Sequence, residues 1–188
     1  EPAEALLQVL LDSASGRVSE TGALRRRMEV LSELTFLVEK SAETADAEKQ
    51  QARLEEKIDH FRQRHPGLLP VKLLFAPGTR FGYELARTTG TEAHWQALGA
   101  PNPADCTDEA KFYESLGLPW IPPETRETGE EVALSRSGQL AKILPWNGVR
   151  GVFHNHTVRS DGAATLEEMV IAAKKLGYQY IGISDHSQ

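Results

Sequence analysis

Three histidines and two aspartates lie close together in the last part of the chain. His154 and His156 are separated by one residue, Asp161 follows His156 by five residues, and Asp185 directly precedes His186. Neutral imidazole nitrogens and carboxylate oxygens are donors that borderline divalent ions such as zinc and manganese accept. The residue types therefore predict a site for a divalent metal, Mn or Zn. The alternative is that these are ordinary polar residues at the ends of strands.

The elements around these side chains are predicted to be a strand, a loop, a helix and a second strand. Strands are expected over residues 152–157 and 178–184, and a Thr-x-x-Glu capping box at Thr165 predicts the start of the helix between them. In a strand, residues two apart share a face, so the His-x-His pair should present both rings together. Parallel strands joined by a helix bring their carboxyl ends to one sheet edge, where His186 should join the pair.

This stretch resembles the first two motifs of the PHP (polymerase and histidinol phosphatase) phosphoesterase family, whose barrel holds two or three metal ions. The resemblance implies four metal ligands, His154, His156, Asp161 and His186, and assigns no ligand role to Asp185. A (β/α) barrel needs about 200 residues or more. We therefore expect the sequence to belong to a longer protein, with metal binding weak or absent and no phosphatase activity in these residues alone.

A glycine and three arginines form a second group of residues that could do chemistry. Gly22 is followed by Arg25, Arg26 and Arg27. A run of arginines is typical of a solvated, charged surface. The alternative is a glycine turn that binds a phosphate chain through its backbone amides and its arginines.

The first half of the chain resembles the palm of bacterial family X DNA polymerases, which have the nucleotidyltransferase fold. In that family a Gly-Ser-x-Arg-Arg turn binds the incoming triphosphate. Gly22, Arg25 and Arg26 match this turn, with Ala23 in the place of the serine. The resemblance implies that these three residues bind phosphate or nucleotide.

The metal-binding carboxylates of that family do not match. Family members hold two magnesium ions with an Asp-x-Asp pair on the next strand and a third aspartate on a later strand. The corresponding positions are Glu33, Thr35 and Lys72, so Glu33 is the only carboxylate left among them. A threonine and an ammonium group cannot hold two divalent ions about 4 Å apart. We expect no nucleotidyl transfer, and we expect Lys72 to pair with Glu33.

Residues 108–126 resemble the thumb of the same polymerases. The stretch begins as a helix that ends at Gly117 and continues as a proline-rich arm, in which Trp120 and Ile121 are expected to pack onto the body. Burial preferences place four more large side chains in the core: Tyr83, Leu85, Trp95 and Leu98.

Together these features predict a mixed α/β (α+β) chain in three parts. Residues 1–90 are a degenerate polymerase palm, 91–148 are a thumb and linker, and 149–188 are the truncated first β-α-β unit of a PHP-type (β/α) barrel. The expected elements of the palm are a helix over 3–12, a short strand after Gly16, a strand over 33–38, a helix over 42–64 and a strand over 71–75.

Composition narrows the possible partners. The net charge is −6 and no segment is basic, which argues against constitutive tight DNA binding and leaves a weak DNA contact. A single cysteine excludes an internal disulfide framework and suggests a cytoplasmic protein. The apolar runs are shorter than the roughly 20 residues that span a bilayer, so no membrane partner is expected.

The function that these resemblances imply is a DNA-repair type of hydrolysis, in which metal-activated water attacks a phosphate ester at a DNA 3′ end or an abasic site. Besides DNA, the remainder of its own barrel is an expected partner. Two alternatives stay open. One is a non-catalytic module that binds nucleic acid or nucleotide through Arg25 and Arg26. The other is a PHP phosphatase that acts on small molecules.

Overall fold

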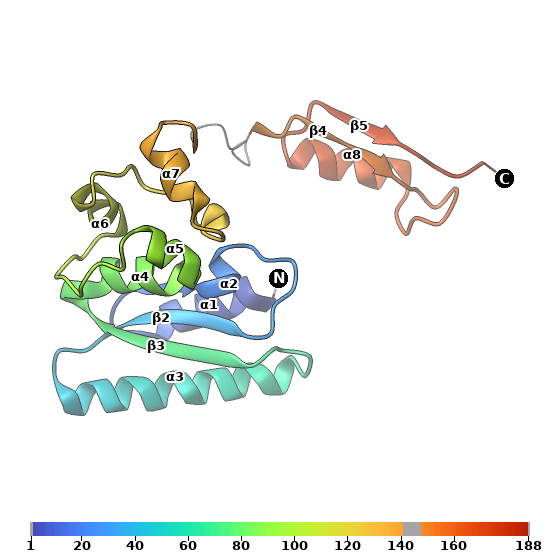
Figure 1. Ribbon diagram of the computed structural model, residues 1–188. Helices are drawn as coiled ribbons and strands as arrows, with labels where there is room; N and C mark the ends of the chain where they lie inside the picture. The colour runs from blue at the N-terminus through green and yellow to red at the C-terminus, as the bar shows by residue number, and fades with distance from the viewer. Residues whose placement is uncertain (1, 141–147, 188) are drawn as a thin grey trace. The chain divides into compact units, whose positions relative to one another are not determined.

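The computed structural model describes residues 2–140 and 148–187, which divide into two compact units (Figure 1). Unit 1 comprises residues 1–141 and unit 2 comprises residues 142–188. The expected palm and most of the expected thumb therefore lie in one unit. None of the helices in the described ranges is long and apolar enough to cross a membrane.

A three-stranded sheet forms the centre of unit 1. The elements up to its last strand are α1 (Pro2–Ser13), β1 (Val18–Thr21), α2 (Gly22–Arg25), β2 (Leu34–Lys40), α3 (Thr44–Arg64) and β3 (Val71–Pro77). The strand order is β1-β2-β3, with β1 antiparallel and β3 parallel to β2. The predicted elements of this half are confirmed, with their ends shifted by a few residues.

Within the described residues of unit 1, six short helical segments follow β3. They are η1 (Gly78–Arg80), α4 (Phe81–Thr89), α5 (Glu92–Ala97), α6 (Glu109–Ser115), η2 (Pro123–Thr125) and α7 (Glu130–Arg136). The last of these, α7, lies in the segment expected to be a linker, and its Val132 is buried in the core.

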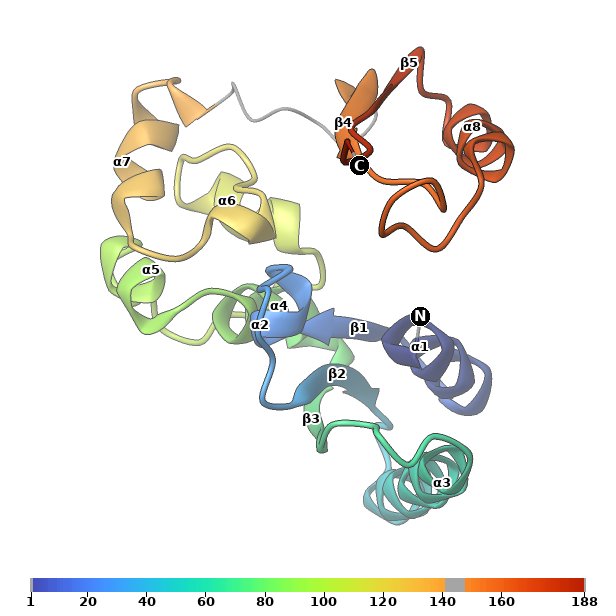
Figure 2. The same ribbon diagram turned by 90° about the vertical axis from the view of Figure 1, so that its right-hand side faces the viewer.

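Helices cover both faces of the sheet (Figure 2). On one face α1 and α3 pack against β2, and Leu54, Ile58 and Phe61 of α3 are buried as their helical spacing predicts. On the other face Phe81 and Leu85 of α4 pack against the sheet. Because both faces are covered, the first five residues of β2 are all buried instead of alternating.

The helical segments share a second core that is rich in aromatic rings. Trp95 stacks on Phe112 with ring centroids 5.8 Å apart, and Tyr83 meets both rings edge-on. Of the four side chains expected in the core, Tyr83 and Leu85 come from α4. Tyr83 packs in the aromatic core and Leu85 packs against the sheet, so α4 belongs to both cores although it precedes the expected palm–thumb boundary at residue 90. All four are buried, so that prediction is confirmed.

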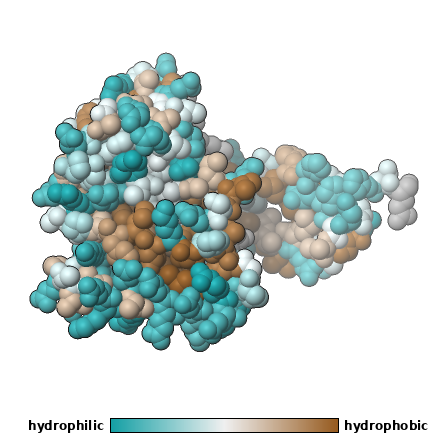
Figure 3. Space-filling model, turned by 60° about the horizontal axis from the view of Figure 1, so that its bottom comes forward, coloured by the Kyte–Doolittle hydropathy of each residue, from teal (hydrophilic) through white to brown (hydrophobic). Residues whose placement is uncertain are grey.

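The proline-rich arm packs only in part as expected. Ile121 is fully buried, whereas Trp120 is 44% exposed and contacts the body through a hydrogen bond from its indole to Glu109 of α6. In the sheet, β3 is one of the two edge strands, and its Val71 and Leu73 are half-buried. Figure 3 shows apolar surface gathered in the middle of the face of unit 1 that it turns forward.

Unit 2 is a single β-α-β arrangement made of β4 (Gly151–Asn155), α8 (Leu166–Lys175) and β5 (Tyr180–Ile183). The two strands are parallel, as predicted. The capping box is confirmed, with Thr165 and Glu168 bonded reciprocally, and Gly177 ends the helix at φ +78°.

The first strand of unit 2 differs from the prediction. It ends at Asn155 instead of residue 157, and its pairing with β5 shifts between Val152 and Asn155. The shift coincides with a left-handed backbone at His154, where φ is +63°. A local irregularity of this kind breaks the two-residue periodicity on which the sequence argument depends.

Candidate metal centre

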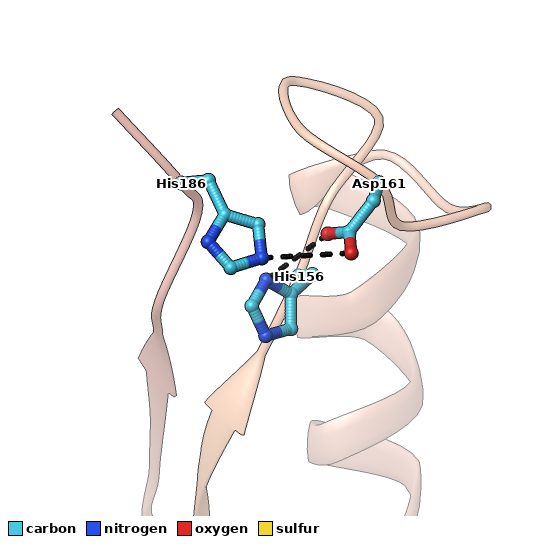
Figure 4. A group of neighbouring side chains, drawn as sticks. All are labelled: His156, Asp161 and His186. Atoms are coloured by element: carbon cyan, nitrogen blue, oxygen red, sulfur yellow. Dashed lines mark ion pairs between the residues drawn. The ribbon is translucent and has the colours of Figure 1, made fainter. Parts of the chain in front are cut away.

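Three predicted ligands meet beyond the carboxyl ends of β4 and β5 (Figure 4). His156 follows β4, His186 follows β5, and Asp161 reaches them from the loop that precedes α8. Nδ1 of His156 lies 3.2 Å from Oδ1 of Asp161, and Nε2 of His186 lies 3.5 Å from Oδ2 of the same carboxylate. Among the described residues this is the one group of at least three candidate donors close enough to share an ion.

The donor geometry fits a divalent ion. Ligand atoms about 2.0–2.2 Å from a tetrahedral ion lie about 3.3–3.6 Å from one another. The two nitrogen–oxygen separations given above, 3.2 and 3.5 Å, are close to this range, and all three donors lie within 4.8 Å of one another. Nδ1 of His156 is buried and has no hydrogen-bond partner in the described part of the chain, although Asp161 is 3.2 Å away. A buried nitrogen without a partner needs an explanation, and an ion between the two groups provides one. Two imidazoles and one carboxylate suit zinc or manganese.

The loop that carries Asp161 is tightly constrained. The carbonyl of Thr157 accepts hydrogen bonds from the amides of Ser160 and Gly162, each at 3.0 Å. A Cβ on Gly162 would lie 1.9 Å from the carbonyl oxygen of His156, so only glycine lets the chain return this closely. The Ser-Asp-Gly turn thus brings Asp161 back beside His156.

The charges of the two aspartates are maintained by their surroundings. Desolvation alone would raise the pKa of Asp161, but a backbone hydrogen bond and the neighbouring His156 and His186 lower the pKa below its ordinary value. For Asp185 the Thr157 amide and hydroxyl lower the pKa. Both groups are carboxylates at neutral pH, the form that can ligate a cation or accept hydrogen bonds.

His154 is not part of the three-residue group. Its ring centroid lies 5.2 Å from that of His156, whereas His156 and His186 stack at 4.7 Å. The two rings of the His-x-His pair lie side by side as predicted, but they do not project from one regular strand, because His156 lies beyond β4 and the backbone at His154 is left-handed. A ligand role for His154 stays a prediction.

The three polymerase-like positions lie around a groove of unit 1. The groove has a volume of about 500 Å³, and Gly22, Glu33, Thr35 and Lys72 are among its lining residues. Thr35 donates to Glu33 at 3.1 Å, and the ammonium of Lys72 lies 3.8 Å from the same carboxylate. The expected pairing of Lys72 with Glu33 is confirmed. Both side chains are about half exposed, so the interaction is a surface ion pair.

The two arginines expected to bind phosphate are bonded to acidic side chains. Arg25 donates twice to Glu109 of α6, at 2.7 and 2.8 Å. Arg26 donates to Glu127 at 2.6 Å and to the carbonyl of Thr89 at 2.7 Å. A phosphate bound by these arginines has to compete with these contacts, and the phosphate-binding role of Gly22, Arg25 and Arg26 stays a prediction.

Sequence reasoning missed the carboxylate at the centre of this network. Glu109 also accepts from Arg126 at 2.7 Å and from the Trp120 indole at 2.8 Å. Burial alone would raise the pKa of Glu109, but the hydrogen bonds from Arg25 and Arg126 lower it to about 2. The four donors saturate the carboxylate and tie the first turn of α6 to the turn after β1.

Part of unit 1 matches a known protein family. The family described as DNA polymerase beta thumb matches residues 82–127. The DNA polymerase/3'-5' exonuclease PolX of Bacillus subtilis (strain 168) is 47% identical over 80 residues. That alignment covers 43% of this chain and 14% of the relative, so the chain spans only a small part of that protein. The chain contains a family X polymerase-like region.

Unit 1 has a second buried polar network, formed by side chains from α5, α6 and α7. His94 of α5 is fully buried, its Nδ1 lies 2.6 Å from Glu131 of α7, and its Nε2 lies 2.9 Å from the hydroxyl of Tyr113 in α6. Burial lowers the pKa of His94. The side chains of this network are buried, so a ligand cannot reach them. The network therefore serves to hold α5, α6 and α7 together.

Proposed function

We propose that the protein is a metal-dependent phosphoesterase that acts on DNA 3′ ends and carries a polymerase-like region without nucleotidyl-transfer activity. The observation that carries the proposal is the convergence of His156, Asp161 and His186 at one sheet edge, in the same chain as a polymerase-type thumb. Unit 2 would be the N-terminal part of a PHP-type barrel, and the thumb would guide DNA toward it. The printed name of the Bacillus relative includes a 3'-5' exonuclease, an activity of the same chemical class.

The chain's own residues have distinct tasks in such a site. His156 and His186 offer neutral nitrogen donors, and Asp161 offers negative charge that offsets part of the charge of a cation. When bound, a divalent ion supplies activation of water and neutralisation of charge on a phosphate oxygen. The constrained loop over 157–162 keeps the carboxylate of Asp161 in place before substrate arrives.

The loss of nucleotidyl transfer is part of the proposal. Its support is the groove of unit 1, where Glu33 is the one carboxylate among the three expected positions and pairs with Lys72. Two-metal transfer needs several anionic oxygens around two ions, and an ammonium group repels both. Template-directed incorporation by the protein with magnesium or manganese would contradict this part of the proposal.

The hydrolytic part is tested with the product of the complete open reading frame that contains this chain. The substrate is gapped duplex DNA labelled at its 5′ end, and shortening of the 3′ end is followed with and without manganese. We expect manganese-dependent shortening that His156→Ala and His186→Ala abolish. His154→Ala tests the predicted fourth ligand, and His60→Ala, an exposed position on α3, is the matched control. Equal activity of all five proteins would refute the metal site.

A non-catalytic DNA-binding module is the second candidate, favoured by the thumb match over residues 82–127. Binding of gapped DNA by the His156→Ala/His186→Ala double variant separates the two. Tight, strongly salt-dependent binding without any hydrolysis by the wild type would support the module. Hydrolysis of small phosphate monoesters in preference to DNA would instead indicate a small-molecule phosphatase.

A further inference from the structure

We infer that Asp185 is a positioning residue, which anchors the loop over 157–162 to the end of β5 and so sets the separation of the three candidate metal ligands. The inference rests on the proposed metal-dependent function. It concerns a residue beside His186 that the family resemblance leaves without a ligand role.

Asp185 bonds to the loop at three points. The amide and the hydroxyl of Thr157 donate to Oδ1 and Oδ2 of Asp185, the hydroxyl bond at 2.7 Å. The hydroxyl of Ser160 donates to Oδ1 at 2.8 Å. Each carboxylate oxygen accepts up to two hydrogen bonds, so Oδ1 is saturated and Oδ2 is half used. Asp185 is therefore occupied by the loop, which explains why it lies outside the three-residue group.

Thr157 is the point through which this anchor acts. It is 1% exposed, and its hydroxyl also accepts from the amide of Arg159 at 3.1 Å. Its carbonyl accepts from the amides on both sides of Asp161, those of Ser160 and Gly162. The position of Thr157 therefore determines where Asp161 lies, and Asp185 determines the position of Thr157.

Besides the β4–β5 ladder and the backbone hydrogen bond from Ser184 to Asn155, this carboxylate joins the segments that follow the two strands. His156 directly precedes Thr157, and His186 directly follows Asp185, so the bonds between Thr157 and Asp185 set the spacing of the two imidazoles. Metal affinity depends on that spacing, and loss of a residue that orients a ligand typically weakens binding about 10- to 100-fold. An oriented site also has less conformational freedom to lose when an ion binds.

The test uses the purified product of the complete open reading frame and measures Co²⁺ binding by the visible absorption of the bound ion, which reports coordination geometry as well as affinity. We expect Asp185→Asn and Thr157→Val each to weaken binding about 10- to 100-fold and to change the absorption spectrum. Because both act through the same bonds, the double variant should be little worse than the more severe single variant. Thr157→Ser keeps the hydroxyl and should bind as the wild type does.

Two controls separate positioning from general damage. Glu167→Gln removes an exposed carboxylate in the first turn of α8 and should leave affinity and spectrum unchanged. Amide hydrogen exchange without metal should accelerate at residues 157–162 in Asp185→Asn while α8 keeps the wild-type rate. Thr157→Val retains the amide bond to Asp185, so it tests the inference even if the aspartate variant folds poorly.

The outcomes distinguish the inference from the function on which it rests. Failure of the wild type to bind Co²⁺, or unchanged binding by His156→Ala, would refute the metal site and the positioning role together. Binding that is lost in His156→Ala but retained, with an unchanged spectrum, in Asp185→Asn would refute only the positioning role.

Discussion

Unit 1 and unit 2 each contain a β-α-β arrangement with the same topology. The two arrangements differ in the hydrogen-bond and ion-pair partners of their charged side chains. In unit 1, β2 and β3 are parallel and joined by α3, and in unit 2, β4 and β5 are parallel and joined by α8. At the carboxyl edge of β2, Glu39 accepts from Arg17 at 2.8 Å, and further donors of Arg17 bond to two backbone carbonyls. At the carboxyl edge of β4, the buried nitrogen of His156 has no hydrogen-bond partner within the described ranges.

This difference shows what a shared topology does and does not determine. Parallel strands gather polar side chains at their carboxyl ends in both units, and a cavity of about 730 Å³ opens at that edge of unit 1. Arg17 and Glu39 line this cavity and neutralise each other, whereas the candidate donors of unit 2 are two histidines that share one carboxylate, Asp161. The pairing of the charges, rather than the fold, is therefore what makes the unit 2 cluster the candidate site.

Packing provides the first and largest test of this comparison. Phe36 of β2 is fully buried between helices, whereas Phe153 of β4 is 73% exposed. We expect Phe36→Ala to lower the free energy of unfolding of unit 1 by about 3–5 kcal/mol. Phe153→Ala should cost well under about 1 kcal/mol, since most of its surface is already in water. Urea denaturation of both variants measures the difference, and equal costs would show that unit 2 buries Phe153 in solution.

The Glu109 network provides the second test, because it is the most completely paired charge of unit 1. Glu109→Gln leaves the fully buried guanidinium of Arg126 without its counter-charge. Loss of one partner of a buried ion pair costs about 3–5 kcal/mol, which should lower the urea midpoint of unit 1. Glu114→Gln, an exposed position on the same helix, is the matched control. A midpoint shared by both variants would mean that the network contributes little.

The contribution of Glu109 should also appear in the wild type, as a loss of unfolding free energy at acid pH. The folded pKa of Glu109 is about 2, below its ordinary value of 4.5, so the unfolded state binds more protons between these pH values. The contribution is complete above about pH 4.5 and is lost as the pH falls toward 2, a change of about 3 kcal/mol for a side chain buried this deeply. Unfolding free energies measured along an acid series should show this loss in the wild type and not in Glu109→Gln.

His94 should add a smaller dependence on pH at milder acidity. Burial lowers its pKa below the ordinary value of 6.5, so the unfolded state again binds more protons. Unit 1 should therefore have its full stability above about pH 6.5 and lose part of it as the pH falls below that value. His94→Gln should flatten this part of the curve. A curve with the same slope in the variant would assign the effect to another group.

The smallest effect is expected at the exposed pair of the groove. Lys72 and Glu33 are 55% and 44% exposed, so solvent screens their attraction. An ion pair of this kind contributes about 0–1 kcal/mol, and Lys72→Ala should cost no more than that. A buried ion pair would cost more than this when one partner is removed. Thermal unfolding of the wild type and Lys72→Ala in low and high salt measures the cost of the substitution. A cost above about 2 kcal/mol would mean that the groove is closed to water in solution.

Features set by short-range physics could be predicted from the sequence alone. The capping box of Thr165 and Glu168 forms because both residues lie within one helical turn. Leu54, Ile58 and Phe61 are buried because their spacing places them on one side of α3. The convergence of His156, Asp161 and His186 also followed, because a β-α-β connection brings the ends of parallel strands together.

Only the tertiary structure decided the features that depend on distant partners or local irregularity. Glu109 and Arg25 are 84 positions apart, and Thr157 and Asp185 are 28 apart, so no local pattern could pair them. The left-handed backbone at His154 interrupts the regular strand that periodicity had predicted, and His154 lies outside the three-residue group. Residue types and spacing thus determined which side chains could do chemistry. Long-range packing and hydrogen bonding decided which partner each of those side chains has.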